Sequence, residues 1–355
     1  MSFALETVFE SDASVGAAGY SERPAFANYY AVAGRFVCIQ TSDANINELL
    51  KRYFAAWHVT ALAEPDGIKS HVTIVIHTSD NQPDPPTQLS WFEVAEGGRC
   101  RTDGQTYFFE NNGSAVMAGH LDTSIVEAWI GNSAESRERA ALARLIFNVA
   151  MVAMRRCGLY ELHSAGVVDP DGKGVLVVGP SGSGKSNLAA QLASAGWQYL
   201  SDDSVLLCSR DGIVQAHALR RMFALTDEIF SAAVIPASDS IEVTIAPFDP
   251  GKKRFEPAQI FPGRFVKSCT PVKVLFSRLA EGVSSRLRLL NRADTMARLL
   301  RMCPWACYDK PTAAAHLEVL AHLARQAEGY ELLAGSELLN SERASEFLLS
   351  KSATN

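Results

Sequence analysis

The chain has 355 residues, of which 47% are hydrophobic and 20% charged, a balance typical of globular proteins that bury a large core. This length predicts two or three domains. The 24 glycines and 15 prolines follow no fixed period, which excludes a collagen-like chain. The 33 basic and 39 acidic residues give a formal charge of −6, which argues against a dedicated nucleic-acid binder, because such proteins depend on Lys and Arg.

Targeting signals and disulfides are not expected. Residues 1–16 contain acidic residues and lack a basic stretch followed by an apolar run, so we predict a cytoplasmic protein without a secretory signal. The most apolar segment, residues 140–153, is too short to cross a bilayer, so we expect no membrane partner. The seven cysteines are scattered, and Cys303, Cys307 and His316 are too few for a zinc site, so reduced, buried thiols are favoured.

Residues 1–132 are predicted to form an N-terminal α+β domain with a mostly antiparallel sheet, serving in substrate recognition or regulation. Apolar residues at helical spacing predict a helix at Ile46–Trp57, and residues 79–87 form a polar, proline-rich loop. Short β-like runs bounded by turn residues predict strands at Arg35–Gln40, His71–His77, Thr106–Phe109 and Ala115–Gly119.

Residues 133–355 are predicted to form a second, α/β domain with a helical C-terminal part. A helix from Ser133 to Cys157, capped by Asn132 or Ser133, is expected to join the two domains. Strands are expected at His163–Val168, Val175–Val178 and, as one continuous strand, Gln198–Leu207. Helices are expected at Lys185–Ala195, Ala293–Arg301 and Thr312–Gln326.

A glycine-rich segment lies between a predicted strand and a predicted helix, and it matches G-x-x-x-x-G-K-[ST], the pattern of a phosphate-binding loop. Its glycines let the backbone approach phosphate, while successive N–H groups and the helix N-terminus attract negative charge. We expect Lys185 to bind the β- and γ-phosphates and the Ser186 hydroxyl to bind Mg²⁺. A site for ATP or GTP is thus predicted at Gly179, Pro180, Ser181, Gly182, Ser183, Gly184, Lys185 and Ser186.

Two adjacent carboxylates, Asp202 and Asp203, follow the predicted helix within an apolar strand. Only one of them can face the nucleotide unless the strand ends or bulges there. Acids in apolar surroundings are costly without partners, so we favour a role in binding Mg²⁺ or in accepting a proton from an attacking hydroxyl. His163 precedes the strand that leads to the loop, and it is either a catalytic group or an ordinary hydrogen-bonded histidine.

Taken together, His163-Ser-Ala-Gly, the glycine-rich loop and the YLSDD segment resemble the HPr kinase/phosphorylase family, whose P-loop core is similar to that of ATP-dependent phosphoenolpyruvate carboxykinase. The resemblance covers about residues 155–280. It implies an α/β P-loop kinase core that uses ATP and Mg²⁺ to phosphorylate a serine of a protein or peptide. It also implies that Asp203 accepts the proton, that His163 supports it, and that Ser186 and Asp203 hold the metal.

The chain departs from the family at several points. Asn187 stands where the family usually has glutamate, and the E-[IV]-R-G-x-G signature is absent after Asp203. Because that signature is tied to phosphorolysis, we expect a kinase without efficient phosphorylase activity. Arg220 or Arg221 is the candidate for a comparable electrostatic role, while the four cations of residues 252–264 form either a phosphoryl clamp or a solvated loop. The N-terminal part does not match the regulatory domain of the bacterial HPr enzymes. The chain is also similar to the divergent HPr-kinase-like enzymes of lasso-peptide clusters, which share its P-loop and double aspartate and phosphorylate precursor peptides.

The leading hypothesis is an ATP-dependent kinase that phosphorylates a hydroxyl, with serine of a peptide or small protein as acceptor. One alternative is a kinase for a small metabolite with the same core. Another is a non-catalytic nucleotide sensor, which has little need for the two aspartates. A carboxykinase reaction is less favoured, because that family's extended set of metal and substrate residues is not found. The oligomeric state stays open, and a homo-oligomer is compatible with the sequence.

Overall fold

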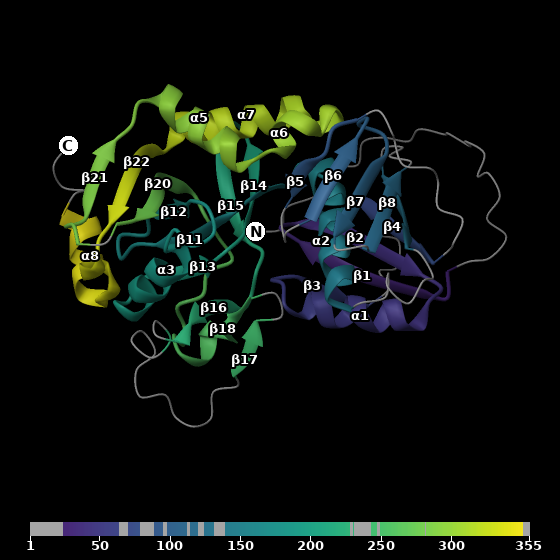
Figure 1. The fold of residues 1–355 in the computed structure, drawn as a ribbon, viewed down its shortest axis with the longest axis horizontal. Helices are drawn as coiled ribbons and strands as arrows, with labels where there is room; N and C mark the ends of the chain where they lie inside the picture. The colour runs from purple at the N-terminus through teal and green to yellow at the C-terminus, as the bar shows by residue number, and fades with distance from the viewer. Residues whose placement is uncertain are drawn as a thin grey trace, which may run out of the picture.

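The computed structural model describes residues 24–350 except 64–69, 79–88, 95–97, 112–113, 120–123, 131–138, 228–229, 231–242, 247–248 and 281. The described residues form a protein that mixes helices with four β-sheets, which confirms a mixed α/β fold. Figure 1 shows the N-terminal sheet, in purple and blue, beside the sheets and helices of the second half, in teal to yellow. The predicted proline-rich loop at residues 79–87 lies outside the described residues.

The N-terminal sheet has nine strands in the order β3-β1-β2-β4-β9-β8-β7-β6-β5. β4 runs parallel to β2 and β9, and all other neighbours are antiparallel, so the sheet is mostly antiparallel as the sequence pattern predicts. The strands are β1 (Phe26–Val32), β2 (Arg35–Thr41), β3 (Thr60–Leu62), β4 (Val72–Thr78), β5 (Phe92–Val94), β6 (Gly98–Thr102), β7 (Tyr107–Asn111), β8 (Ser114–Gly119) and β9 (Ile125–Ile130).

Helix α1 (Ala44–Ala55) begins after Asp43, whose carboxylate accepts hydrogen bonds from two backbone N–H groups of the first turn. Such a cap satisfies donors that the start of a helix leaves unpaired. Ile46, Leu50 and Phe54 recur at helical spacing and are buried in the core of the sheet. The structure therefore confirms the helix predicted here.

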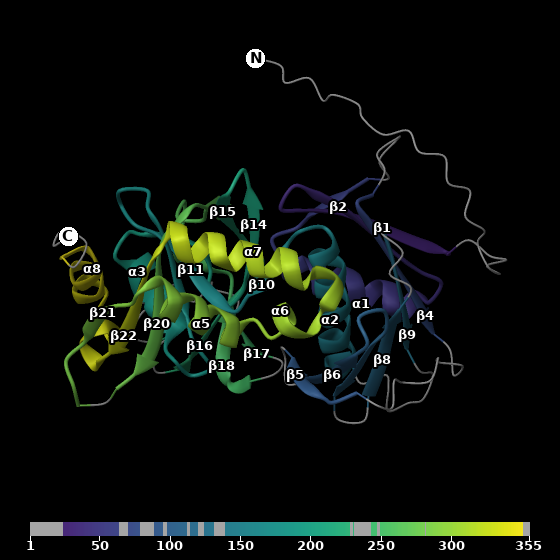
Figure 2. The same cartoon turned by 90° about the horizontal axis from the view of Figure 1, so that it is seen from above.

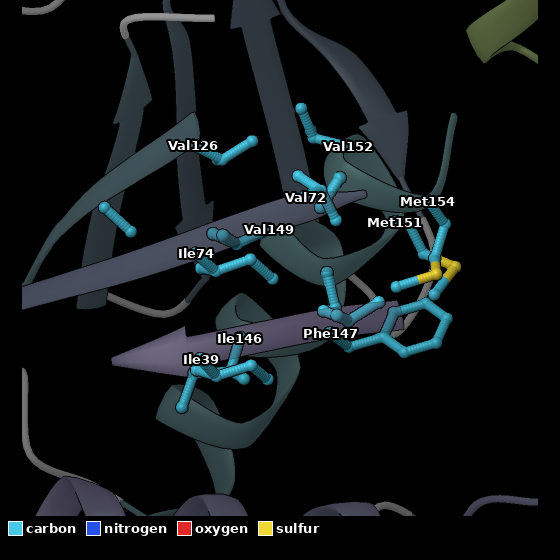
Figure 3. Packing of buried hydrophobic residues seen from close by; sticks show 14 of the residues in the cluster. Ile39, Val72, Ile74, Val126, Ile146, Phe147, Val149, Met151, Val152 and Met154 are labelled. Carbon is cyan, nitrogen blue, oxygen red and sulfur yellow. The ribbon is translucent and has the colours of Figure 1, made fainter. Parts of the chain in front are cut away.

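Helix α2 (Arg139–Arg156) supplies much of the core beneath the N-terminal sheet. Every described residue of α2 from Ile146 to Arg155 is buried, and the same core contains Leu206, Leu219 and Trp305 from the second half of the chain. The predicted caps of this helix lie outside the described residues. Figure 3 shows part of this packing, with Ile39, Val72, Ile74 and Val126 from the strands and Ile146, Phe147, Val149, Met151, Val152 and Met154 from α2.

A second sheet has six strands in the order β13-β11-β12-β20-β22-β21. β12, β20 and β22 run parallel to one another, while β11, β13 and β21 are antiparallel to their neighbours. The whole of β12 is buried, as its continuous apolar sequence predicts. The strands are β11 (Ser164–Val168), β12 (Gly174–Val178), β13 (Gln198–Ser201), β20 (Pro271–Leu279), β21 (Arg286–Leu289) and β22 (Glu328–Ala334).

Two smaller sheets flank this one. A four-stranded sheet has the order β10-β14-β15-β19 and consists of β10 (Tyr160–Leu162), β14 (Val205–Arg210), β15 (Ile213–Ala218) and β19 (Ser268–Cys269). A three-stranded sheet has the order β16-β18-β17 and consists of β16 (Phe223–Thr226), β17 (Val243–Ala246) and β18 (Asp249–Phe255).

The single strand predicted at Gln198–Leu207 is wrong. β13 ends at Ser201 in the six-stranded sheet, and β14 begins at Val205 in the four-stranded sheet. Asp202 and Asp203 lie in the connection between them. The apolar residues on both sides conceal this break, because local hydrophobicity does not show which sheet a strand joins.

The helices of the second half include those predicted near residues 185–195, 293–301 and 312–326. The helical C-terminal part also contains two strands that the sequence patterns did not predict, β21 and β22, which extend the six-stranded sheet. Figure 2 shows α7 running from the second half toward α2. Within the described ranges, no helix is long and apolar enough to cross a membrane. The helical elements of the second half are α3 (Lys185–Ser194), η3 (Pro257–Gln259), α5 (Arg292–Met302), α6 (Trp305–Tyr308), α7 (Lys310–Gln326), η4 (Ser336–Leu339) and α8 (Ser341–Ser350).

A buried polar network ties the N-terminal sheet to α2 and to the start of α7. The Asp309 carboxylate accepts hydrogen bonds of 2.6 Å from Arg155 Nε and from the Tyr107 hydroxyl. The Arg155 guanidinium also lies over the ring of Trp305, 3.9 Å from its centre. Burial opposes ionisation of Asp309, yet Arg155 and the hydrogen bonds hold its pKa below the ordinary value.

Candidate functional site

The glycine-rich segment forms the connection between β12 and α3 in the six-stranded sheet. Gly182 and Gly184 have φ angles of +79° and +87°, a region that side-chain-bearing residues rarely adopt. A Cβ on Gly179 would lie 2.5 Å from Ser183 Oγ and 2.7 Å from the Ser277 carbonyl oxygen. The backbone conformation and the close packing therefore require glycine at these positions.

Lys185 begins α3 and reaches back over the loop. Its ammonium donates hydrogen bonds to the carbonyl oxygens of Gly179 (2.9 Å) and Pro180 (3.0 Å), and the residue is 5% exposed. Burial lowers the pKa of Lys185, while the nearby charges of Asp203 and Asp202 oppose this shift. The ammonium thus lies at the loop, within electrostatic reach of both aspartates.

The neighbouring strand β20 is hydrogen-bonded to the loop. The Ser277 hydroxyl donates a buried hydrogen bond of 2.8 Å to the Ser183 carbonyl oxygen, and the Ser183 N–H donates to the Pro180 carbonyl oxygen at 3.2 Å. The Ser183 hydroxyl oxygen is buried and has no hydrogen-bond partner in the described part of the chain. It is therefore an additional donor available at the loop.

Asp202 is 1% exposed and lies beside Ser186. Its Oδ2 accepts a hydrogen bond of 3.0 Å from the Ala224 N–H, and the Ser186 hydroxyl donates to its carbonyl oxygen at 3.3 Å. Among the described residues, Oδ1 has no hydrogen-bond partner. Burial raises the pKa of Asp202, and the charge of Asp203 raises it further.

Asp203 and His163 lie in contact at the surface. His163 Nδ1 lies 3.2 Å from Asp203 Oδ1, and the two side chains are 36% and 40% exposed. His163 lies between β10 and β11, and Asp203 lies between β13 and β14. Because β10 pairs with β14 and β11 pairs with β13, these two connections cross between the same two sheets side by side. The strand pairing therefore brings the histidine to the aspartate.

The two arginines considered as electrostatic groups contact different partners. The Arg220 guanidinium is 4.6 Å from the ring centre of Phe147, at the contact with the N-terminal half. Arg221 Nε donates a hydrogen bond of 2.6 Å to Glu256. An electrostatic role for either arginine stays a prediction.

Among the cations of residues 252–264, Lys252 has the clearest relation to the loop. Its charge lowers the pKa of Lys185. Lys253 instead pairs with Asp227 at 3.3 Å, and Arg264 donates to the Gly196 carbonyl oxygen at 2.8 Å. Lys252 is therefore a cation to consider in phosphate chemistry, whereas Lys253 and Arg264 bond to other groups.

The three residues considered for zinc have different surroundings. Cys303 is buried, Cys307 is exposed, and the His316 ring stacks on Tyr160 with 4.6 Å between ring centres. The described residues contain no group of three or more His, Cys, Asp or Glu side chains arranged to hold a metal on their own.

Sequence reasoning missed Ser277 and Ala224, which hold the loop and Asp202. The apolar run Val274–Phe276 is the signal that could have predicted β20 as a buried strand leading to Ser277. The Ala224 contact uses a backbone N–H, so its amino-acid type carries no signal for this function.

A comparison with curated proteins supports the resemblance seen in the motifs. No family model matches the chain. A 69-residue segment is 35% identical to HPr kinase/phosphorylase from Chlorobium phaeobacteroides (strain BS1), and this match covers 19% of the chain and 20% of that protein. The structure of the Hpr(Ser) kinase/phosphatase from Coxiella burnetii matches with a TM-score of 0.29 and 13% identity, over 54% of this chain and 99% of the other. The expected resemblance to HPr kinase/phosphorylase is confirmed, as a divergent one at low identity. The matched segment spans about a fifth of the curated relative.

Proposed function

We propose that the protein is an ATP- and Mg²⁺-dependent kinase with an α/β P-loop core, which phosphorylates a serine hydroxyl of a peptide or small protein. The observation that carries this proposal is the contact of His163 with Asp203 (3.2 Å), which lies within electrostatic reach of Lys185 at the glycine-rich loop. It supports a site with a cation for phosphate and an accessible carboxylate for the acceptor hydroxyl.

The residues of the loop fit a triphosphate. The space that a side chain on Gly179 would fill is already occupied, and Gly182 and Gly184 hold the backbone in conformations that form a tight turn before α3. The ten-residue helix α3 contributes positive potential at its N-terminus. On binding, the Lys185 ammonium would exchange the carbonyl oxygens of Gly179 and Pro180 for phosphate oxygens, which are stronger acceptors.

The residues present also fit Mg²⁺ bound together with phosphates. Ser186 and Asp202 supply oxygens of the type Mg²⁺ prefers, and Asp202 Oδ1 is a buried carboxylate oxygen with no hydrogen-bond partner among the described residues. Mg²⁺ would supply neutralisation of the charge on the β- and γ-phosphates. The assignment of Asp203 as a metal ligand stays a prediction, and the contacts of Ser186 favour Asp202 beside it.

The proposed reaction is an in-line transfer. The acceptor oxygen forms a bond to the γ-phosphorus, the bond from that phosphorus to the bridging oxygen breaks, and ADP leaves. Asp203 accepts the proton of the hydroxyl as the bond forms, and His163 orients the Asp203 carboxylate. Lys185 stabilises negative charge on the transferred group.

The class of acceptor rests on the resemblance alone. The matched relative is named as a kinase and phosphorylase, and the segment that matches it is a fifth of its length. We propose that the N-terminal sheet, together with α1 and α2, selects the acceptor. We also propose that phosphorolysis is weak, because the signature associated with it is absent from the sequence.

The test is a phosphate-transfer screen with the wild-type protein and Asp203→Asn. Candidate serine peptides and small hydroxy compounds are each incubated with ATP or GTP and Mg²⁺, and products are identified by mass spectrometry. Asp203→Asn is expected to reduce transfer by about 10²–10⁴-fold while nucleotide affinity, measured by calorimetry, stays within about threefold. The matched control is Asp171→Asn, because Asp171 is 69% exposed and pairs with Lys173 away from the loop. Unchanged transfer in Asp203→Asn would remove Asp203 from the mechanism, and nucleotide binding without transfer to any acceptor would favour a sensor.

A further inference from the structure

The connections that follow β20 and β22 lie at the same edge of the six-stranded sheet as the glycine-rich loop. β12, β20 and β22 run parallel, so their carboxyl ends meet at one edge. Ligands of open α/β sheets bind at this edge. Residues 282–284 after β20 are all exposed, and they belong to a connection that lies against the segment after β22.

Two large apolar side chains are exposed at this place. Leu279 is 54% exposed and Val283 is 43% exposed. Leu279 lies directly over the loop, since a Cβ built on Gly184 would be 2.8 Å from Leu279 Cδ2. An apolar side chain that touches a phosphate-binding loop while remaining accessible is a candidate contact for the apolar part of a ligand.

The positions of the charged groups indicate how a nucleotide would be oriented on the loop. His163 and Asp203 lie on the β11 and β13 side of β12, whereas Leu279 and Val283 lie on the β20 and β22 side. If the γ-phosphate of a nucleotide on the loop faces Asp203, the nucleoside end extends away from the aspartates. That direction leads over Gly184 to Leu279.

We propose that Leu279 and Val283 form the surface on which the base and ribose of the bound nucleotide pack. This inference rests on the proposed function, because it assumes a triphosphate on the loop with its γ-phosphate at Asp203. The surface is already ordered by neighbouring contacts. The Ala280 N–H donates to the Ala334 carbonyl oxygen at 3.0 Å, and the Gly335 N–H donates to the Ser285 hydroxyl at 2.8 Å. The connection after β20 is thereby attached to the end of β22.

The experiment compares two ligands that share phosphates but differ in the nucleoside. Binding of a non-hydrolysable ATP analogue and of inorganic tripolyphosphate, each with Mg²⁺, is measured by calorimetry for the wild type and for Leu279→Ala/Val283→Ala. The double variant is expected to bind the ATP analogue about tenfold or more weakly, because it loses apolar contact with the base. Its affinity for tripolyphosphate is expected to stay within about twofold.

The control variant is Leu289→Ala, because Leu289 is equally exposed, at 55%, and lies in the edge strand β21. It is expected to bind both ligands as the wild type does. Equal weakening of both ligands in the double variant would show that Leu279 acts on the loop itself and would overturn the inference. Unchanged affinity of the double variant for the ATP analogue would overturn it as well. If the wild type binds neither ligand, the proposed function fails and the inference fails with it. If the wild type binds both ligands but the double variant binds the ATP analogue as tightly, only the inference fails.

Discussion

Asp202 and Asp203 are adjacent in the chain, yet they lie in opposite environments. Asp202 is 1% exposed and accepts a hydrogen bond from the Ala224 N–H, whereas the Asp203 side chain is 40% exposed and pairs with His163. The connection from β13 to β14 makes this difference, because it carries the chain out of one sheet and into another. A buried carboxylate beside Ser186 and an accessible one beside a histidine can serve different steps of one reaction.

Asp202→Asn is expected to stabilise the protein at pH 8. Burial raises the pKa of Asp202, so the folded state binds this proton more tightly than the unfolded chain. The cost of the buried charge is therefore absent below the ordinary Asp range and grows as the pH rises through the raised pKa. The amide removes that charge and can still accept from the Ala224 N–H. We expect a midpoint of thermal unfolding about 2–5 °C above the wild type at pH 8 and a smaller difference at pH 5. An identical difference at both pH values would contradict the raised pKa.

Lys185→Met is expected to weaken triphosphate binding without unfolding the protein. Methionine preserves an unbranched apolar side chain in a place that is 5% exposed, but it removes the ammonium that bonds to Gly179 and Pro180. Loss of a charge-assisted contact to phosphate is expected to lower affinity for tripolyphosphate by about 30-fold or more. Calorimetry measures the affinity, and thermal unfolding checks the fold. Wild-type affinity in this variant would exclude Lys185 as a phosphate ligand.

Lys252→Ala is expected to slow phosphate transfer more than Lys253→Ala. The charge of Lys252 acts on Lys185, whereas Lys253 pairs with Asp227 and lies over the Phe230 ring. A cation beside the transferred group stabilises the charge that develops on it, so we expect kcat to fall about 10–100-fold for Lys252→Ala. Steady-state kinetics with ATP and an acceptor that the wild type phosphorylates measures this effect. Equal losses in the two variants would indicate a shared role in packing β18.

His316→Phe is expected to make the protein less sensitive to acid. Burial, followed by the charge of Arg155, lowers the pKa of His316 to about 3. Between about pH 6.5 and pH 3 the unfolded chain therefore binds a proton at His316 that the folded state does not bind. The free energy of unfolding decreases as the pH falls through this range. Phenylalanine keeps an aromatic ring beside Tyr160 and does not titrate. We expect the variant to lose about 3 kcal/mol less stability than the wild type between pH 7 and pH 4. Urea unfolding at both pH values measures the difference, and equal losses would show that other groups control it.

Asp309→Asn is expected to cost about 3–5 kcal/mol of stability, because it leaves the buried Arg155 guanidinium without its charged partner. Tyr107→Phe removes the hydrogen bond to Asp309 and the one that the hydroxyl accepts from Arg156, but it leaves the charged pair in place and is expected to cost about 1–2 kcal/mol. Arg99→Ala is the control, since Arg99 is 48% exposed in its pair with Glu110 and should cost less than about 1 kcal/mol. Urea unfolding compares the three variants. A small loss for Asp309→Asn would show that the network contributes little to joining α2 with α7.

Local sequence patterns predicted much of the candidate site. The apolar run of β12, the glycines after it and the Lys-Ser pair occupy consecutive positions, so their chemistry and their spacing appear in one short stretch. The helices α1, α3, α5 and α7 were also predictable, because apolar residues recur along them at helical spacing. By contrast, β20 and β22 lie far along the chain from β12, and their places beside it depend on pairing that no local pattern records.

The sequence by itself determined the glycine-rich loop, the lysine and serine at the start of α3, and the two acids that follow, because each depends on residue type and short-range spacing. Only the tertiary structure decided that Asp202 is buried beside Ser186, that Asp203 meets His163, and that Leu279 covers Gly184. These relationships arise where strands of different sheets and distant segments meet. Hydrogen bonding between β10 and β14 and between β11 and β13 sets the register that brings His163 to Asp203, over a separation of 40 positions in the chain.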